Sequence, residues 1–217
     1  MTKILLLILA LPKSIYFNFK YLSFKNAIRL PILVSHRVWL LDTSGRLFLD
    51  KPRTACVRIG FGEVGIFDKR KSRSVWQCTG EVRFKGRAHI GHGSKISVSG
   101  TVEFGDSFEI SAESAIASKK KKKFGDNVLV SWDVLIIDSD FHAIYARTGA
   151  RLNEDAQVKI GNNVWIGCRS LVMKGVDIPD GVVVGAGSVV NKSLAHSDSI
   201  FAGSPAVLVR SDIVWKK

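Results

Sequence analysis

The residue types that suggest chemistry lie in one short stretch, "VLIIDSDFHAIY", from Val134 to Tyr145. Four apolar residues are followed by two aspartates, a phenylalanine and His142. Imidazole has an unperturbed pKa of ~6.5, so it exchanges a proton near neutral pH, and a carboxylate on its other ring nitrogen would fix its tautomer. The candidate orienting carboxylates are Asp138, Asp140, Glu154 and Asp155. The alternative for the two aspartates is that they only form turns that cap a loop.

Two other polar clusters could bind a ligand, and we assign neither of them a site. "HIGH", from His89 to His92, suggests a metal, but only His142 would remain as a third ligand, so two corner histidines are the simpler interpretation. The run from Lys119 to Lys123 lacks the interleaved aromatic residues of a nucleic-acid site. We predict no metal and no nucleic acid. The lysine run is interpreted as a solvated bulge at a corner, which could steer an anionic ligand.

The composition indicates one domain with an anionic partner. The chain has 217 residues, 46% of them hydrophobic, which is enough for a buried core. Its net charge is +13, and this excess favours a nucleic acid, a membrane surface or a phosphorylated ligand without deciding among them. The three cysteines form no CxxC pair, which argues against a disulfide scaffold and favours the cytoplasm.

The first 40 residues combine apolar, aromatic and basic side chains. The apolar run from Ile4 to Leu11 is too short to span a bilayer, and it lacks a small-residue cleavage site. Lys20, Lys25 and Arg29 stand between aromatic and aliphatic positions. Two interpretations stay open: a segment on a membrane surface, or a helix packed on its own domain or on a neighbouring subunit.

The elements that must position His142 follow a repeat of six residues. Apolar residues recur at this spacing in three series: Phe84, Ile90, Ile96, Val102 and Phe108; Phe124, Val130 and Ile136; and Ile160, Ile166, Val172, Ile178, Val184 and Val190. Neither a helix nor an alternating strand has this period, whereas hexapeptide repeats form parallel β-helices. Each hexad supplies a short strand and a corner, and three hexads complete a triangular coil with the aliphatic residues stacked inside.

The repeat is interrupted between Ile136 and Ile160, where residues 139–157 are polar. We predict that this segment is a loop thrown out from a coil, and long loops on rigid scaffolds usually carry function. The chain is therefore divided into an N-terminal segment (1–40), a β-helix domain (41–210) and a tail (211–217).

The last third of the chain resembles a known family. "IGNNVWIGCRSLVMKGVDIPDGVVVGAGSVVNKSL", followed by "FAGSPAVLVR", is similar to the hexapeptide-repeat acyltransferases, such as the maltose, galactoside and serine acetyltransferases. The apolar segments before the repeat look like those of acyltransferases from bacterial surface-polysaccharide gene clusters. The resemblance implies an all-β fold, a left-handed parallel β-helix with an excursion loop, and homotrimers with active sites between neighbouring helices.

The resemblance also implies roles for individual residues. His142 would be the general base, and Asp140 the partner that orients it. The matching coenzyme A contacts are Trp165, Cys168, Gly185, Ala186, Asn191, Lys192, Ser204, Pro205 and Arg210. Asn191 stands where the family has threonine, and Val207 stands where relatives often carry a basic residue.

The implied activity is transfer of an acetyl group from acetyl-CoA to a hydroxyl of a sugar or glycan in bacterial surface-polysaccharide biosynthesis. The alternatives are N-acetylation of a nucleotide-linked amino sugar, a hexapeptide-repeat scaffold without catalysis, and a zinc hydratase on the same fold. We expect a cytoplasmic homotrimer that rests on the inner membrane through its first residues.

Overall fold

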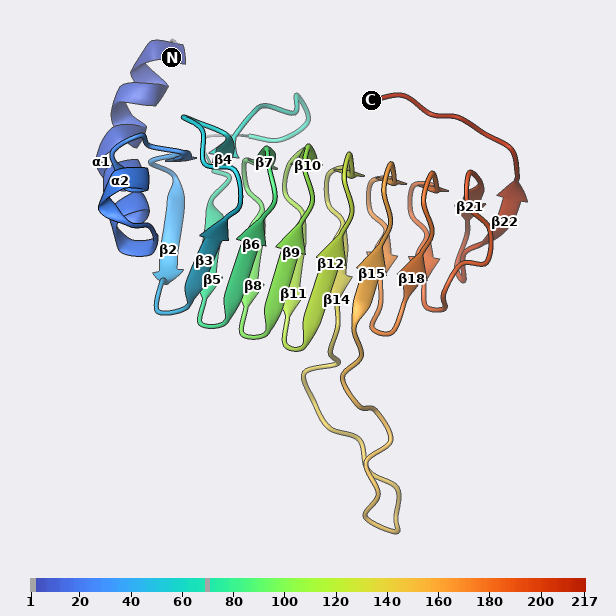
Figure 1. Ribbon diagram of the computed structural model, residues 1–217. Coiled ribbons are helices and arrows are strands. Elements are labelled where there is room, and N and C mark those ends of the chain that lie inside the picture. The colour runs from blue at the N-terminus through green and yellow to red at the C-terminus, as the bar shows by residue number, and fades with distance from the viewer. Residues whose placement is uncertain (1–2, 69–70) are drawn as a thin grey trace.

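The computed structural model describes residues 3–68 and 71–217, and it shows a left-handed parallel β-helix with a helical cap at its N-terminal end (Figure 1). Two helices come first, α1 (Lys3–Tyr21) and α2 (Phe24–Ala27). The chain then winds through three sheets, which we call A, B and C, and successive coils add strands to each sheet in turn. The predicted fold class is confirmed.

The strand pairs in these sheets are parallel, except that the last strand of sheet A pairs antiparallel with its neighbour. Sheet A contains β1 (Ile32–Val34), β4 (Val57–Phe61), β7 (Ala88–Gly91), β10 (Phe108–Ile110), β13 (Leu129–Val130), β16 (Trp165–Ile166), β19 (Val183–Val184), β21 (Ile200–Ala202) and β22 (Val207–Arg210). Sheet B contains β2 (Val38–Asp42), β5 (Ser74–Cys78), β8 (Lys95–Val98), β11 (Ala115–Ser118), β14 (Leu135–Ile137), β17 (Leu171–Val172) and β20 (Val189–Val190). Sheet C contains β3 (Arg46–Leu49), β6 (Glu81–Phe84), β9 (Thr101–Phe104), β12 (Lys121–Phe124), β15 (Val158–Ile160) and β18 (Asp177–Ile178).

The β-helix begins before residue 41, inside the segment that the sequence analysis set apart as 1–40. β1 starts at Ile32, and its residues pair with those of β4. The sequence of the first coils shows no regular six-residue spacing, because the connections between their strands are long. One example is residues 62–73, which connect β4 to β5.

Apolar side chains fill the interior in three columns, one behind each sheet. The columns are Ile59, Ile90, Ile110, Val130, Ile166 and Val184 behind sheet A; Trp76, Ile96, Ile116, Ile136, Val172 and Val190 behind sheet B; and Phe84, Phe104, Phe124, Ile160 and Ile178 behind sheet C, each at most 3% exposed. Full burial of one such side chain contributes about 1.5–3 kcal/mol, so the columns hold the coils together.

The spacing of the first predicted series is wrong at one corner. Phe104, rather than Val102, continues the column above Phe84, because two extra residues stand between sheets B and C in this coil. Val102 is buried beside that corner. The rings of Phe84, Phe104 and Phe124 stack with centroid distances of 5.0 and 5.3 Å. From Ile160 onward the column residues follow the six-residue spacing as predicted.

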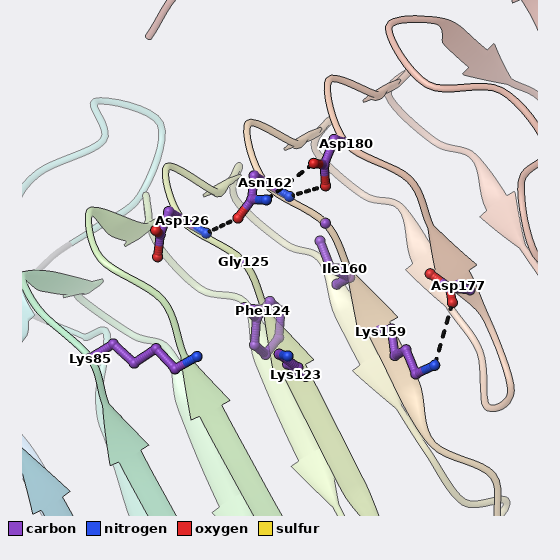
Figure 2. A pocket seen from close by; sticks show the side chains of 11 residues that line it. Lys85, Lys123, Phe124, Gly125, Asp126, Lys159, Ile160, Asn162, Asp177 and Asp180 are labelled. Atoms are coloured by element: carbon purple, nitrogen blue, oxygen red, sulfur yellow. Dashed lines mark hydrogen bonds and ion pairs between the residues drawn. The ribbon is translucent and has the colours of Figure 1, made fainter. Parts of the chain in front are cut away.

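A ladder of polar side chains supports the corner between sheets C and A. The Asn162 side-chain oxygen accepts a hydrogen bond from the Asp126 amide at 2.8 Å, and the Asp180 carboxylate accepts one from the Asn162 amide at 2.7 Å (Figure 2). A Cβ on Gly125 or Gly161 would lie 2.6 or 2.3 Å from the next oxygen of the ladder. The recurring pairs of glycine and Asp or Asn in the sequence therefore shape this corner.

Helix α1 covers the free edge of β1 at the N-terminal end. The Asn18 side chain exchanges two hydrogen bonds with the Ile32 backbone, at 2.7 and 3.1 Å. The Ser14 hydroxyl accepts one from the Val34 amide at 2.9 Å, and Phe17 is buried below it. These side chains replace the missing neighbouring strand, which leaves no open edge for pairing with another chain here.

The C-terminal residues 211–217 turn back along sheet A (Figure 1). The Trp215 indole donates to the Asn163 carbonyl at 2.7 Å, and the Lys217 ammonium lies 3.0 Å from the Glu109 carboxylate. The tail therefore covers part of the outer face of this sheet.

Candidate active site

Residues 138–157 leave the coil between β14 and β15 and project from the corner between sheets B and C (Figure 1). Asp138 anchors the base of this loop and is fully buried. Its carboxylate accepts hydrogen bonds from the Lys119 amide at 2.8 Å and from the Ser118 hydroxyl at 2.7 Å. It also pairs with the buried Lys122 ammonium at 3.1 Å.

Burial acts on both partners of this ion pair. Burial alone would raise the pKa of Asp138, but the Lys119 amide and the Lys122 charge outweigh it, so the pKa falls below its ordinary value. Burial lowers the pKa of Lys122 to about 8 against the pull of Asp138. The pair is a structural tie between β12 and the loop.

The lysine run is therefore only partly a solvated bulge. Lys119 and Lys120 form the corner as predicted, whereas Lys121, Lys122 and Lys123 belong to β12. The side chain of Lys122 points inward at a strand position that an aliphatic residue would normally fill. It is tolerated because the loop supplies Asp138 as its counter-ion.

A second ion pair holds the loop above its base. The Lys174 ammonium, just after β17, lies 2.6 Å from the Asp140 carboxylate. Donation by Lys174, and then by Asn153, lowers the pKa of Asp140. The Asn153 amide nitrogen donates to both Asp140 and the His142 carbonyl at 2.8 Å, while its oxygen accepts from the Ile144 amide at 2.6 Å. This network fixes the backbone on both sides of His142.

The His142 side chain itself is exposed. Within residues 3–68 and 71–217, none of the four candidate carboxylates makes a hydrogen bond with its imidazole. Glu154 and Asp155 face Arg151 instead, at 3.5 and 3.7 Å. Asp140 is thus linked to the backbone of His142 through Asn153, rather than to its ring. The imidazole is open to a ligand.

Five of the predicted coenzyme contacts gather at the corner between sheets A and B, on three successive coils. They are Cys168, Gly185, Ala186, Ser204 and Pro205. Ala186 is exposed, and its amide makes no hydrogen bond to any described residue, so it can donate to a ligand. A Cβ on Gly167 would lie 2.6 Å from this amide. The absence of a side chain at Gly167 therefore keeps this backbone donor accessible.

The remaining predicted contacts lie elsewhere. Asn191 and Lys192 are exposed just after β20, at the corner between sheets B and C. Arg210 pairs with Ile200 at the far edge of sheet A, so one chain does not bring Lys192 and Arg210 to a single corner. Both basic side chains are exposed.

Trp165 lies on the outer face of sheet A, where β16 pairs it with Val183 of the next coil. Its indole donates to the Ser131 hydroxyl at 3.0 Å. Its ring packs against Trp215 of the returning tail, with centroids 6.0 Å apart. The structure therefore gives Trp165 a role in holding the tail.

Other polar clusters add no further site to this arrangement. A cavity of about 340 Å³ on sheet C is lined by Lys85, Lys123 and Lys159 together with the ladder residues, and it contains none of the predicted site residues (Figure 2). In the part of the chain that the structure describes, no three His, Cys, Asp or Glu side chains are grouped to hold a metal. The His92 ring accepts a hydrogen bond from the Val64 amide at 3.3 Å.

Sequence reasoning missed the two residues that hold the loop, Asn153 and Lys174. Lys174 is 34 positions from Asp140, and no motif links the two. The available signal was the position of Lys174 two residues after the aliphatic Val172, which places it at the same corner as the loop. Asn153 gave no signal, because a buried asparagine inside a polar loop looks like any other loop residue.

Comparison with known proteins finds a family that matches part of the chain. The family described as "Bacterial transferase hexapeptide (six repeats)" matches residues 157–192, which form β15 to β20. The coils from β15 to β20 therefore match a hexapeptide-repeat family in sequence. The resemblance drawn from the sequence is confirmed for the repeat that builds these coils.

One relative in sequence and one solved structure similar in fold are described as acetyltransferases. A polysialic acid O-acetyltransferase from Neisseria meningitidis is 44% identical over 104 residues, and the chain spans about half (48%) of that relative's length. The crystal structure of the polySia-specific acetyltransferase NeuO superimposes with a TM-score of 0.54 over 85% of this chain and 74% of that one, at 22% identity. The second likeness shows that the two proteins share a fold.

Proposed function

We propose that this protein transfers an acetyl group from acetyl-CoA to a hydroxyl of a sugar in a bacterial surface polysaccharide. The observation that carries the proposal is the 44% identity with a polysialic acid O-acetyltransferase over 104 residues. The exposed imidazole of His142, on a loop whose backbone is held by an ion pair and by Asn153, supports it.

In the proposed reaction, His142 takes the proton of the acceptor hydroxyl as the hydroxyl oxygen attacks the thioester carbonyl. The bond between the carbonyl carbon and sulfur breaks, and the departing sulfur receives the proton. A sugar hydroxyl is a poor nucleophile without such a base, and a well-placed base contributes about 10²–10⁴-fold in rate. The backbone of His142 is held in one place by Asp140, Asn153 and Lys174. Because the base is already positioned, less conformational entropy is lost on reaching the transition state.

The coenzyme would lie along the corner between sheets A and B. The free Ala186 amide is available to an amide carbonyl of the pantetheine arm, and the lack of a side chain at Gly167 leaves that amide accessible. Lys192 and Arg210 carry exposed positive charge suited to the coenzyme phosphates, but they lie at different corners of one chain.

This separation, and an apolar face on sheet B, favour a site shared between copies of the chain. His142 and Ala186 flank opposite edges of sheet B. One outward row on this sheet includes Lys95 and is apolar from there on, with Ala115, Leu135, Leu171 and Val189. The outward column on sheet C is charged, with Glu103, Lys123, Lys159 and Asp177. An apolar sheet face of this kind is suited to burial against a second copy, which would bring His142 of one copy to the coenzyme corner of the next. A homotrimer built in this way completes the proposal.

Calorimetric titration with acetyl-CoA and with free CoA tests the donor. We expect saturable binding with one site per chain, followed by acetyl transfer to polysialic acid or to another glycan in an acceptor screen, detected by mass spectrometry. Lack of binding at millimolar concentration would overturn the proposal in favour of a scaffold. A product that survives mild base, and is therefore an amide rather than an ester, would point to N-acetylation of an amino sugar instead.

A further inference from the structure

Helix α1 has two faces with different roles. Its inward face, with Ala10, Ser14, Phe17 and Asn18, is buried against β1 and closes the end of the β-helix. Its other faces carry large apolar side chains that remain between 40% and 71% exposed: Ile4, Leu5, Leu7, Ile8, Leu9, Leu11, Ile15, Tyr16 and Phe19. The interpretation of a helix packed on its own domain thus holds for one face of α1, while the other faces remain open.

The open face continues onto α2. The rings of Phe19 and Phe24 are in contact, with centroids 5.8 Å apart. Phe24 is 72% exposed, and Ile28, one turn further, is 56% exposed. Contiguous apolar surface of this extent on one end of a soluble protein marks an interaction site rather than a chance exposure.

The charged residues of this segment of the chain are all basic. Residues 1–41 contain no aspartate or glutamate. Lys20, Lys25 and Arg29 are exposed beside Phe19, Phe24 and Ile28 in the sequence, and none of the three forms an ion pair with a described residue. Apolar side chains that insert among acyl chains, rimmed by lysine and arginine, are complementary to a bilayer with anionic headgroups.

The same contacts argue against a membrane-spanning α1. Residues Ile4–Tyr21 are long and apolar enough to cross a bilayer, with a mean hydropathy of 1.3. However, the Lys13 ammonium donates to the His36 and Val38 carbonyls at 2.7 and 2.5 Å, and Asn18 completes the edge of β1. A spanning helix would lose these bonds and open the end of the core. The helix can lie in the interface without losing any of them.

We infer that α1 and α2 form a docking cap that places this protein on the surface of an anionic phospholipid bilayer. The apolar side chains of α1, Phe24 and Ile28 enter the headgroup region, while Lys20, Lys25 and Arg29 contact the phosphates. The inference does not depend on the proposed catalytic activity, because it rests on the cap alone.

Sedimentation of the full chain with vesicles tests the inference. The protein should pellet with vesicles of phosphatidylcholine mixed with phosphatidylglycerol, much less with phosphatidylcholine alone, and less as salt is raised. Each basic residue near an anionic surface strengthens binding about fivefold, so the triple variant Lys20→Gln, Lys25→Gln and Arg29→Gln should lose on the order of a hundredfold. The double variant Ile15→Glu and Phe24→Glu should lose binding altogether.

Val214→Glu is the matched control, because Val214 is an equally apolar residue, 86% exposed on the C-terminal tail. It should bind vesicles like the parent chain, and thermal melts should show that all variants are folded. A parent protein that stays in the supernatant with both kinds of vesicle overturns the inference. So does a double variant that binds vesicles normally but forms smaller oligomers by light scattering, since a second copy would then cover the face.

Discussion

The imidazole of His142 is exposed, and the structure holds the residue through its backbone. The Asn153 side-chain amide donates to the His142 carbonyl and to Asp140, which in turn accepts from Lys174 on the neighbouring coil. A loop of this length would otherwise sample many conformations. A long loop therefore carries His142, and a network of half-buried polar side chains holds its backbone.

Replacement of His142 by alanine should separate chemistry from binding. We expect the rate of acetyl transfer to fall about 10²–10⁴-fold, because the acceptor hydroxyl loses its base. Affinity for coenzyme A should be unchanged, since the base acts only in the chemical step. Steady-state kinetics and calorimetry on the same preparation measure both quantities. An unchanged turnover number would show that another residue is the base.

Replacement of Lys174 by methionine should act on the loop without removing the base. The apolar chain keeps the packing but loses the ion pair with Asp140, so we expect a lower turnover number with little change in coenzyme affinity. Lys174→Arg, which keeps the charge, should restore part of the activity. The hydrogen bond from Lys174 lowers the pKa of Asp140, so this carboxylate stays ionised at pH values below the ordinary aspartate pKa. The ion pair of the parent protein therefore persists from neutral pH into that acidic range. Faster hydrogen exchange in residues 139–157 of the methionine variant would report the loosened loop.

Removal of the Asp138 carboxylate alone should lower the free energy of unfolding more than removal of both Asp138 and Lys122. Asp138→Ala leaves the Lys122 ammonium buried without a counter-ion, which costs about 3–5 kcal/mol in the free energy of unfolding. The double variant Lys122→Met and Asp138→Ala should recover part of that loss, and urea denaturation measures both. A single variant as stable as the parent would contradict the assignment of the pair as a structural tie.

The same pair predicts a pH dependence. The folded-state pKa of Lys122 is about 8 and its ordinary value is 10.5. Between these values the unfolded chain binds a proton that the folded chain releases, so the contribution of this group to stability rises with pH across that window. The parent should therefore gain stability relative to Lys122→Met as pH increases above 8.

At the scale of the elements, the coils are held together by columns of like side chains, and the aromatic column behind sheet C is the bulkiest part. Phe104 stacks on both Phe84 and Phe124 and is fully buried. Phe104→Ala should cost about 3–5 kcal/mol in the free energy of unfolding. Phe19→Ala, at a position that is 45% exposed, should cost far less in the same denaturation experiment. Equal losses would mean that the column does not carry the stability assigned to it.

At the scale of the whole molecule, sheet B is the face that should join copies of the chain. Leu135→Glu together with Leu171→Glu should lower the oligomeric mass measured by light scattering, and it should abolish transfer if each site needs two copies. Leu208→Glu is a matched control, because Leu208 is 42% exposed and Leu135 is 40% exposed. A double variant that keeps both mass and activity would place the contact between copies on another face.

The sequence by itself determined the β-helix and the position of the loop that carries His142. Inward-facing residues such as Ile166, Val172 and Ile178 recur once on each side of the triangular coil. A pattern that is local in the sequence therefore encodes the architecture directly. The loop was visible because the same pattern stops at Ile136 and resumes at Ile160.

Only the tertiary structure decided which polar residues meet. The pairs Lys122 with Asp138, Asp140 with Lys174, and Trp165 with Trp215 join positions that no periodic pattern relates. The extra residues at the corners of the early coils likewise shift Phe104 into the column in place of Val102. Hydrophobic burial repeats along the chain and can be read locally, whereas an ion pair or a ring contact depends on where a loop or a tail returns in space.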